Sequence, residues 1–234
     1  MYMKKKLFVF AAAAPLGLAA VSASGALVIN EIDSDTYNSP ATDYAEFIEI
    51  YSTTGTATPL DGLTLVLFNG NGDVSYGAID LDGLTTNANG YYVLGTPSVP
   101  GADDTTFLVN QGTPGNFLQN GQDAVALYTG DATSFANGTA ATTVNLVDAI
   151  VYGTGDADDT GLLAALGEAV QYDEGSPTPP SDAANLTLAR LPDGFGEFAT
   201  LTPTPGSANV VPEPAASIGL VAFCGLLVAR RRRK

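Results

Sequence analysis

Short runs of β-type residues alternate with turn residues along most of the chain. The clearest runs span residues 27–32, 45–51, 63–68, 91–94, 106–109, 124–128, 146–152 and 186–191. Asn-Gly and Asp-Gly pairs separate many of the runs, and these pairs favour the positive φ angles of tight hairpin turns. Eight or more short strands with such turns predict an antiparallel all-β domain, either a sandwich or a barrel.

The run 45–51 has the most regular alternation, with residues 47, 49 and 51 on one face and 46, 48 and 50 on the other. Each face mixes a glutamate with apolar residues, so neither is plainly the solvent side. We therefore expect Glu46 and Glu49 to lie near a sheet edge or a partner group. Residues 159–168 are the one helical candidate, and the glycines at both ends, Gly161 and Gly167, predict a short helix.

The first 26 residues predict a secretory signal peptide. Lys4, Lys5 and Lys6 precede an apolar stretch over 7–20, and the small residues of 21–26 allow cleavage after Ala23 or Ala26. The alternative is a first transmembrane helix, but the apolar stretch is short and ends in small polar residues.

The chain ends in three distinct parts. Pro212-Glu213-Pro214 follows Val211, residues 215–229 are free of charge, and the last five residues are Arg230, Arg231, Arg232, Arg233 and Lys234. A full helical span needs about 20 apolar residues, so the stretch of 15 is short for a membrane helix unless Arg230 reaches to the interface. A basic end predicts a cytoplasmic C-terminus and an external body.

This ending closely resembles the PEP-CTERM sorting signal of bacteria, with Val211–Pro214 at the position of the VPEP box and Arg230–Arg233 as the basic cluster. The resemblance implies transient anchoring in the inner membrane, recognition by an exosortase, removal of the helix and delivery to the cell surface or extracellular matrix. It also implies a link to exopolysaccharide. A permanent single-pass anchor is the alternative.

The two ends hold nearly all the positive charge. Eight of the nine basic residues lie there, which leaves Arg190 against 24 acidic residues between Leu27 and Val211, a net charge of −23. Such a body repels nucleic acid and anionic lipid, because both are bound through Lys and Arg. The body also lacks Cys, so burial rather than disulfides must stabilise it.

Several segments together resemble lamin-tail domains over residues 27–209. They are LVINEI at 27–32, YAEFIEIY at 44–51, LDGLTL at 60–65, FLQNGQDAVAL at 117–127, VDAIVYG at 147–153, LTLAR at 186–190 and TPTPGSAN at 202–209. Against the family pattern, Leu63 stands where an aromatic residue is usual, and extra loop length lies around 74–78 and 132–143. The resemblance implies an immunoglobulin-like β-sandwich and a non-enzymatic module.

Arg190 is the one candidate for a specific polar contact. A lone cation among so many acids is expected to pair with one of them, and we expect a structural ion pair with Glu49 or Asp148. The alternative is that Arg190 binds the carboxylate of a ligand. Hydrolysis with a His base is excluded because the chain has no His, and zinc lacks its usual ligands.

Calcium is the cofactor that the acidic loops allow, since Ca²⁺ takes carboxylate and carbonyl oxygens. The candidate ligands are Asp33, Asp35, Asp156, Asp158 and Asp159, with Asp103-Asp104 as a further acidic pair; solvated turn acids are the alternative. We therefore expect an exported, structural or adhesive, non-enzymatic protein. The rival is a calcium-dependent hydrolase, or a hydrolase accessory module, acting on polysaccharide or phosphoester.

Overall fold

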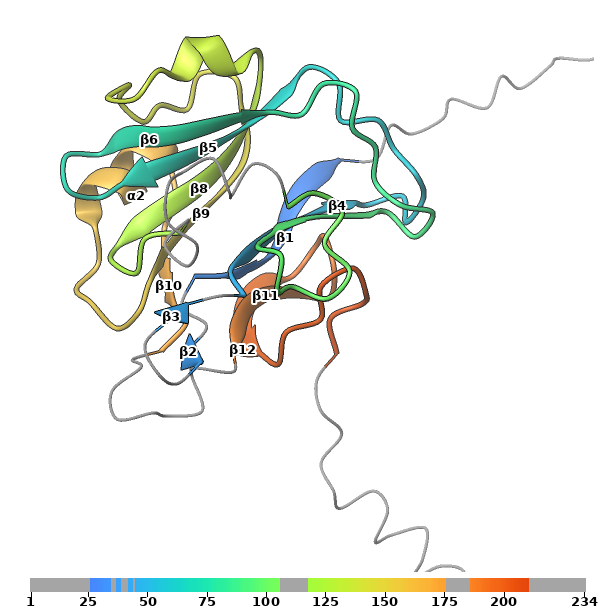
Figure 1. Ribbon diagram of the computed structural model, residues 1–234. Helices are drawn as coiled ribbons and strands as arrows, with labels where there is room; N and C mark the ends of the chain where they lie inside the picture. The colour runs from blue at the N-terminus through green and yellow to red at the C-terminus, as the bar shows by residue number, and fades with distance from the viewer. Residues whose placement is uncertain are drawn as a thin grey trace, which may run out of the picture.

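The computed structural model describes residues 26–34, 37–38, 42–43, 45–105, 118–175 and 186–210. These residues form two five-stranded sheets with little helix, which confirms the predicted all-β sandwich class (Figure 1). The first sheet has the order β12-β11-β1-β4-β7 and the second the order β10-β9-β8-β5-β6.

The first sheet consists of β1 (Leu27–Asp33), β4 (Phe47–Ser52), β7 (Tyr91–Gly95), β11 (Thr187–Leu191) and β12 (Glu197–Leu201). The second sheet consists of β5 (Leu63–Asn69), β6 (Val74–Asp80), β8 (Asp123–Thr129), β9 (Leu146–Gly153) and β10 (Gln171–Asp173). The remaining elements are the strand pair β2 (Tyr37–Asn38) and β3 (Thr42–Asp43), the 3-10 helix η1 (Ala132–Phe135) and the helix α2 (Thr160–Leu166).

Two parts of the topology differ from the sequence expectation. The segment 74–78, expected as extra loop, belongs to strand β6, whose buried residues are Ser75, Gly77 and Ile79, so its inward positions carry little hydrophobic signal. Strand β10 pairs in parallel with β9 rather than antiparallel, because helix α2 carries the chain back across the sheet. The predicted strand at 106–109 lies outside the described residues.

The core between the sheets is apolar. It joins aliphatic side chains of β1 and β4 to those of β5 and β8, and Tyr152 of β9 is fully buried among them. On β4, Ile48 and Ile50 face this core, while Glu49 lies on the outer face. The alternation predicted for this strand therefore separates a core face from a second buried face.

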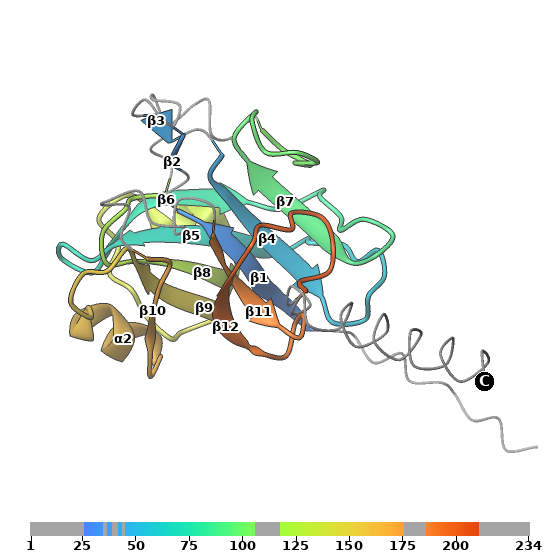
Figure 2. The ribbon, with the colours of Figure 1, turned by 90° about the horizontal axis from the view of Figure 1, so that it is seen from below.

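Each sheet is covered on its outer side, by different means. The outer face of the second sheet is covered by η1 and α2 through Phe135, Leu162 and Leu166, which we call the helical cover. The outer face of the first sheet is crossed by residues 202–209, which we call the strap; it is the orange-red segment that leaves β12 and runs across β1 and β4 in Figure 2.

The predicted signal peptide, the 211–214 box and the apolar stretch 215–229 lie outside the described residues. Within the part of the chain that is described, no helix has the length and apolar character needed to cross a bilayer.

Candidate functional site

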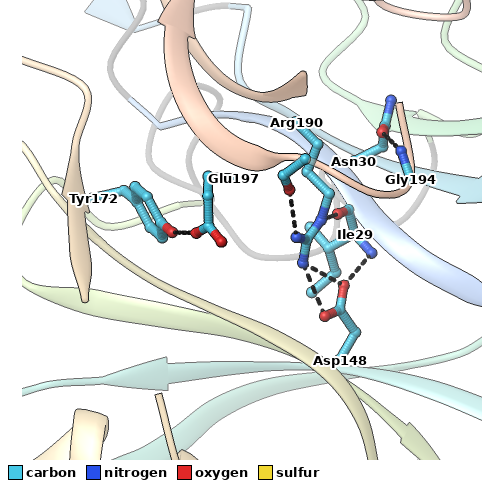
Figure 3. Close-up of polar contacts among 8 residues, drawn as sticks. Ile29, Asn30, Asp148, Tyr172, Arg190, Gly194 and Glu197 are labelled. Carbon is cyan, nitrogen blue, oxygen red and sulfur yellow. Dashed lines mark hydrogen bonds and ion pairs between the residues drawn. The ribbon is translucent and has the colours of Figure 1, made fainter. Parts of the chain in front are cut away.

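Arg190 connects the two sheets. Its Nη2 donates to Asp148 Oδ1 at 2.9 Å and Oδ2 at 3.1 Å, so that a side chain of β11 reaches β9 of the opposite sheet (Figure 3). Its Nε donates to the Ile29 carbonyl at 2.8 Å and its Nη1 to the Gly196 carbonyl at 3.0 Å. The guanidinium carbon lies 4.3 Å from the centre of the Phe198 ring. The whole guanidinium is thus occupied by the fold.

Of the two acids expected to pair with Arg190, the structure brings Asp148 to it and leaves Glu49 on the other face of the first sheet. Asp148 Oδ2 also accepts the Ile29 N–H at 2.8 Å. Burial raises the pKa of Asp148, and the positive charge of Arg190 opposes that rise. We call this pair, with the Ile29 backbone between its members, the clasp.

A second polar group is buried beneath the strap. Glu31 of β1 lies directly opposite Glu49 of β4 in the strand register, and neither residue has any exposed surface. A β-bulge between Ile29 and Glu31 turns Asn30 to the same face, where its Nδ2 donates to Glu49 Oε1 at 2.8 Å. Two carboxyl groups and an amide are therefore enclosed on what would otherwise be the solvent side of the sheet.

The strap attaches to these carboxyl groups through its backbone. The Thr204 N–H donates to Glu31 Oε1 at 2.8 Å, and the Gly206 N–H donates to Glu49 Oε2 at 2.7 Å. At the end of the strap, Asn209 Nδ2 donates to the Arg190 carbonyl at 3.0 Å. The sequence TPTPGSAN therefore has a structural role, since it places amide donors over two glutamates.

The turn between β11 and β12 completes the enclosure through Asp193. Its Oδ1 accepts from Asn30 Nδ2 and from the Asn209 N–H, each at 3.1 Å, and its Oδ2 accepts from the Tyr91 hydroxyl at 3.0 Å. The Gly194 N–H donates to Asn30 Oδ1 at 2.9 Å. We call Asn30, Glu31, Glu49, Asp193, Thr204 and Asn209 the strap cluster.

Burial dominates the titration of this cluster. It raises the pKa of Glu31 to about 7, opposed by hydrogen bonds from Thr204 and Thr187, and that of Glu49 to about 8, opposed by hydrogen bonds from Asn30 and Gly206. Asp193 adds like charge to each glutamate. No cationic side chain contributes here, because Arg190 is the only Lys or Arg between residues 27 and 210 and its guanidinium is held by the clasp.

An open pocket of about 500 Å³ lies beside the strap. Its lining residues are mostly apolar: Asp33, Ala45, Phe47, Val99, Pro100, Thr202, Pro203, Thr204, Pro205 and Ser207. The strap therefore has one side against the strap cluster and another against this pocket.

The candidate calcium ligands do not form one group. Asp33 ends β1 and is buried, whereas Asp156 and Asp158 are exposed in the loop before α2. Asp159 caps α2, its Oδ1 accepting the N–H groups of Gly161 and Leu162 at 2.8 and 2.9 Å. Among the described residues, no three acidic or cysteine side chains are placed to hold a metal ion, and Asp35 lies outside them. Calcium binding stays a prediction.

The strap cluster contains residues that sequence reasoning did not assign to a site. The mixed faces of the run 45–51 predicted that Glu49 lies near a sheet edge or a partner group; β4 lies inside its sheet, and the partner is the backbone at residue 206. The sequence feature that forms this cover is the TPTPGSAN segment, whose Thr, Pro, Gly and Ser residues are typical of an ordinary surface loop. No protein family, curated protein or solved structure matches this chain.

Proposed function

We propose that the protein is an exported, non-enzymatic module of the cell surface or extracellular matrix, with an immunoglobulin-like, lamin-tail-like sandwich delivered by a PEP-CTERM signal. The single observation that carries the proposal is the order of parts along the chain: a basic and apolar N-terminus, an acidic β-sandwich, a Val-Pro-Glu-Pro box, an apolar stretch and an arginine cluster.

The charge of the body supports an external, polymer-associated role. A sandwich with a net charge of −23 between residues 27 and 211 repels membranes and nucleic acid, and its self-repulsion keeps copies apart unless cations bridge them. The partners that fit are the exosortase and secretion machinery during export, and afterwards exopolysaccharide or other surface proteins.

The geometry of the polar groups supports a structural rather than a catalytic role. Glu31 and Glu49 have raised pKa values, as a general acid would need, but the strap covers both and neither is exposed. Arg190 is likewise fully occupied by contacts within the fold, which favours a clasp over a receptor for a ligand carboxylate.

Mass spectrometry of the protein recovered from its own host tests the proposal. We expect an N-terminus after Ala23 or Ala26 and a C-terminus near Val211–Pro214, without the arginine cluster. A matched variant, Pro212→Ala with Pro214→Ala, should keep the apolar tail. An intact C-terminus in the unaltered protein at the cell surface would contradict the sorting proposal and favour a permanent anchor.

An activity screen tests the second half of the proposal. Polysaccharides and phosphoesters should show no turnover above buffer, with or without calcium. Reproducible turnover that is lost on changing one aspartate would overturn the non-enzymatic assignment.

A further inference from the structure

The hydroxyl of Thr204 lies between two acceptors. Its Oγ1 is 2.6 Å from Asn209 Oδ1 and 3.0 Å from Glu31 Oε2. The orientation of the Asn209 amide is set by its other end, since Nδ2 donates to the Arg190 carbonyl. A hydroxyl has a single hydrogen, so it cannot donate to both oxygens at once.

The closed network is fully satisfied only when one oxygen of Glu31 carries a hydrogen. With the Thr204 hydrogen donated to Asn209, the contact with Glu31 Oε2 is a hydrogen bond if Glu31 is protonated and donates to Thr204 Oγ1. If Glu31 is ionised, the single hydrogen of Thr204 can satisfy either Glu31 Oε2 or Asn209 Oδ1, and the other oxygen faces Thr204 Oγ1 without a hydrogen between them. Glu49 lies directly opposite Glu31, and the negative charge of an ionised Glu31 raises the pKa of Glu49.

We infer that the strap, residues 202–209, is a proton-dependent latch: it is held on the first sheet while Glu31 is protonated, and it loosens when Glu31 and Glu49 are both ionised. The latch can open without breaking a strand pair, because β12 ends at Leu201 and the strap begins at the next residue. The latch is a property of the folded domain alone and does not depend on the proposed export.

The groups around the pair do not supply a compensating charge. Tyr51 of β4, Tyr91 of β7 and Asp193 of the β11–β12 turn face the strap cluster, and burial raises the pKa of both tyrosines. From β11, Arg190 contributes only its carbonyl. The strap sequence TPTPGSAN has no titratable side chain. Ionising both glutamates therefore places two adjacent negative charges beneath a neutral cover.

The direction of the effect follows from the pKa values. Burial raises the pKa of Glu31 to about 7 and that of Glu49 to about 8, so the closed strap binds protons more tightly than an open one that hydrates the carboxyl groups. Amide donors from the strap favour the ionised form and oppose this preference, but burial is the larger of the two causes. The strap is therefore expected to loosen progressively as the pH rises from the ordinary glutamate value of 4.5 towards these raised values, with little further change above about 8.

Hydrogen exchange measured by NMR tests the latch in the purified protein. Protection factors, corrected for the intrinsic pH dependence of exchange, are compared at pH 5.5, 7 and 8.5 for the amides of Thr204, Gly206 and Asn209. We expect them to fall about tenfold or more over this range, because each pH unit between the pKa of a carboxyl group in the open strap and its raised pKa in the closed strap shifts the open-to-closed ratio about tenfold. Amides of Leu65 and Val125 in the second sheet should keep their protection.

The variant Glu31→Gln supplies the decisive comparison. Its amide can accept from the Thr204 N–H and donate to Thr204 Oγ1, as protonated Glu31 does. We expect the strap of this variant to stay protected at pH 8.5, while the surface control Asp158→Asn behaves like the unaltered protein.

Two results would overturn the latch. Strap protection that is constant from pH 5.5 to 8.5 would show that ionisation of the pair does not open the strap. Strap and second-sheet amides that lose protection together would show global unfolding instead. Both readings come from the unaltered protein, so they hold even if Glu31→Gln does not fold.

Discussion

The outer faces of both sheets are covered, but one cover is apolar and the other is polar. The helical cover places Leu162, Leu166 and Phe135 on an apolar surface of β5, β8 and β9. The strap covers β1 and β4 with backbone amides that bind Glu31 and Glu49. Apolar burial stabilises without depending on pH, whereas a buried carboxyl group stabilises only in the protonation state that its surroundings favour.

The difference shows where a chain with almost no cations can place its acids. The single cation of the body stabilises the partly buried carboxylate of Asp148, whereas the fully buried Glu31 and Glu49 accept from backbone amides of the strap. The first sheet is consequently expected to respond to pH and to loss of single polar groups, and the helical cover to loss of apolar volume.

The largest expected effect is at the clasp. Arg190→Met should lower the free energy of unfolding by up to about 3–5 kcal/mol, since it leaves the partly buried Asp148 without a cation. Chemical denaturation followed by circular dichroism measures the change. The double variant Arg190→Met with Asp148→Asn should be more stable than Arg190→Met alone. Equal stability of the two variants would mean that the ion pair does not contribute to stability.

The helical cover should be almost as sensitive, but without a pH dependence. Leu162→Ala removes a fully buried side chain and should cost about 2–5 kcal/mol at pH 6 and at pH 8.5 alike. Leu163→Ala, at a partly buried neighbour, is the matched control and should cost less. A cost for Leu162→Ala that changes strongly with pH would remove the contrast between the two covers.

The two glutamates of the strap cluster should respond differently to amide substitution. Both oxygens of Glu49 accept hydrogen bonds, one from Asn30 Nδ2 and one from the Gly206 N–H. In Glu49→Gln, the amide nitrogen replaces one of these oxygens and faces a hydrogen-bond donor instead of accepting from it. We expect a loss of about 1–3 kcal/mol at pH 6 from the broken hydrogen bond. Glu31→Gln should cost less at this pH, and the reverse order would show that the proton lies on Glu49 instead.

The smallest effect concerns the loop before α2. Asp159→Ala should cost about 1 kcal/mol through loss of the N-cap, while Asp159→Asn should retain most of the stability because Asn also caps helices well. Thermal melts with millimolar calcium test the calcium prediction, and an unchanged Tm of the unaltered protein would contradict it. A calcium-dependent rise in Tm that Asp159→Asn abolishes would make Asp159 a metal ligand as well as a cap.

The sequence predicted the class of fold and most strands because they combine β-type residues with Asn-Gly and Asp-Gly turns. It also predicted α2, which begins after the cap Asp159 and ends at Gly167 with a φ of 74°. Strand β6 was missed because Ser75 and Gly77 carry no hydrophobic signal. The hydrogen bond from Thr204 to Glu31 joins residues 173 positions apart, and a local pattern does not encode which backbone amide will cover which glutamate.

The central claim is that buried protons hold the strap cluster together, and the pH dependence of global stability tests it most directly. The chain has no His, and the other carboxyl groups whose pKa burial raises, such as Asp148 and Glu168, are present in every variant, so the difference between the unaltered protein and Glu31→Gln isolates Glu31. A carboxyl group whose pKa is raised on folding stabilises at low pH, and that contribution is lost as the pH rises from its unfolded value of about 4.5 towards its folded value. Asp123, whose pKa burial raises to about 6, adds to the lower end of the window in all variants alike.

The measurement is the free energy of unfolding of the unaltered protein and of Glu31→Gln at pH 5.5, 7 and 8.5. We predict a fall on the order of 2–4 kcal/mol for the unaltered protein, and a fall at least ~1.4 kcal/mol smaller for Glu31→Gln. A stability that is constant or rises across this window, or a variant that follows the unaltered protein in parallel, would contradict the account.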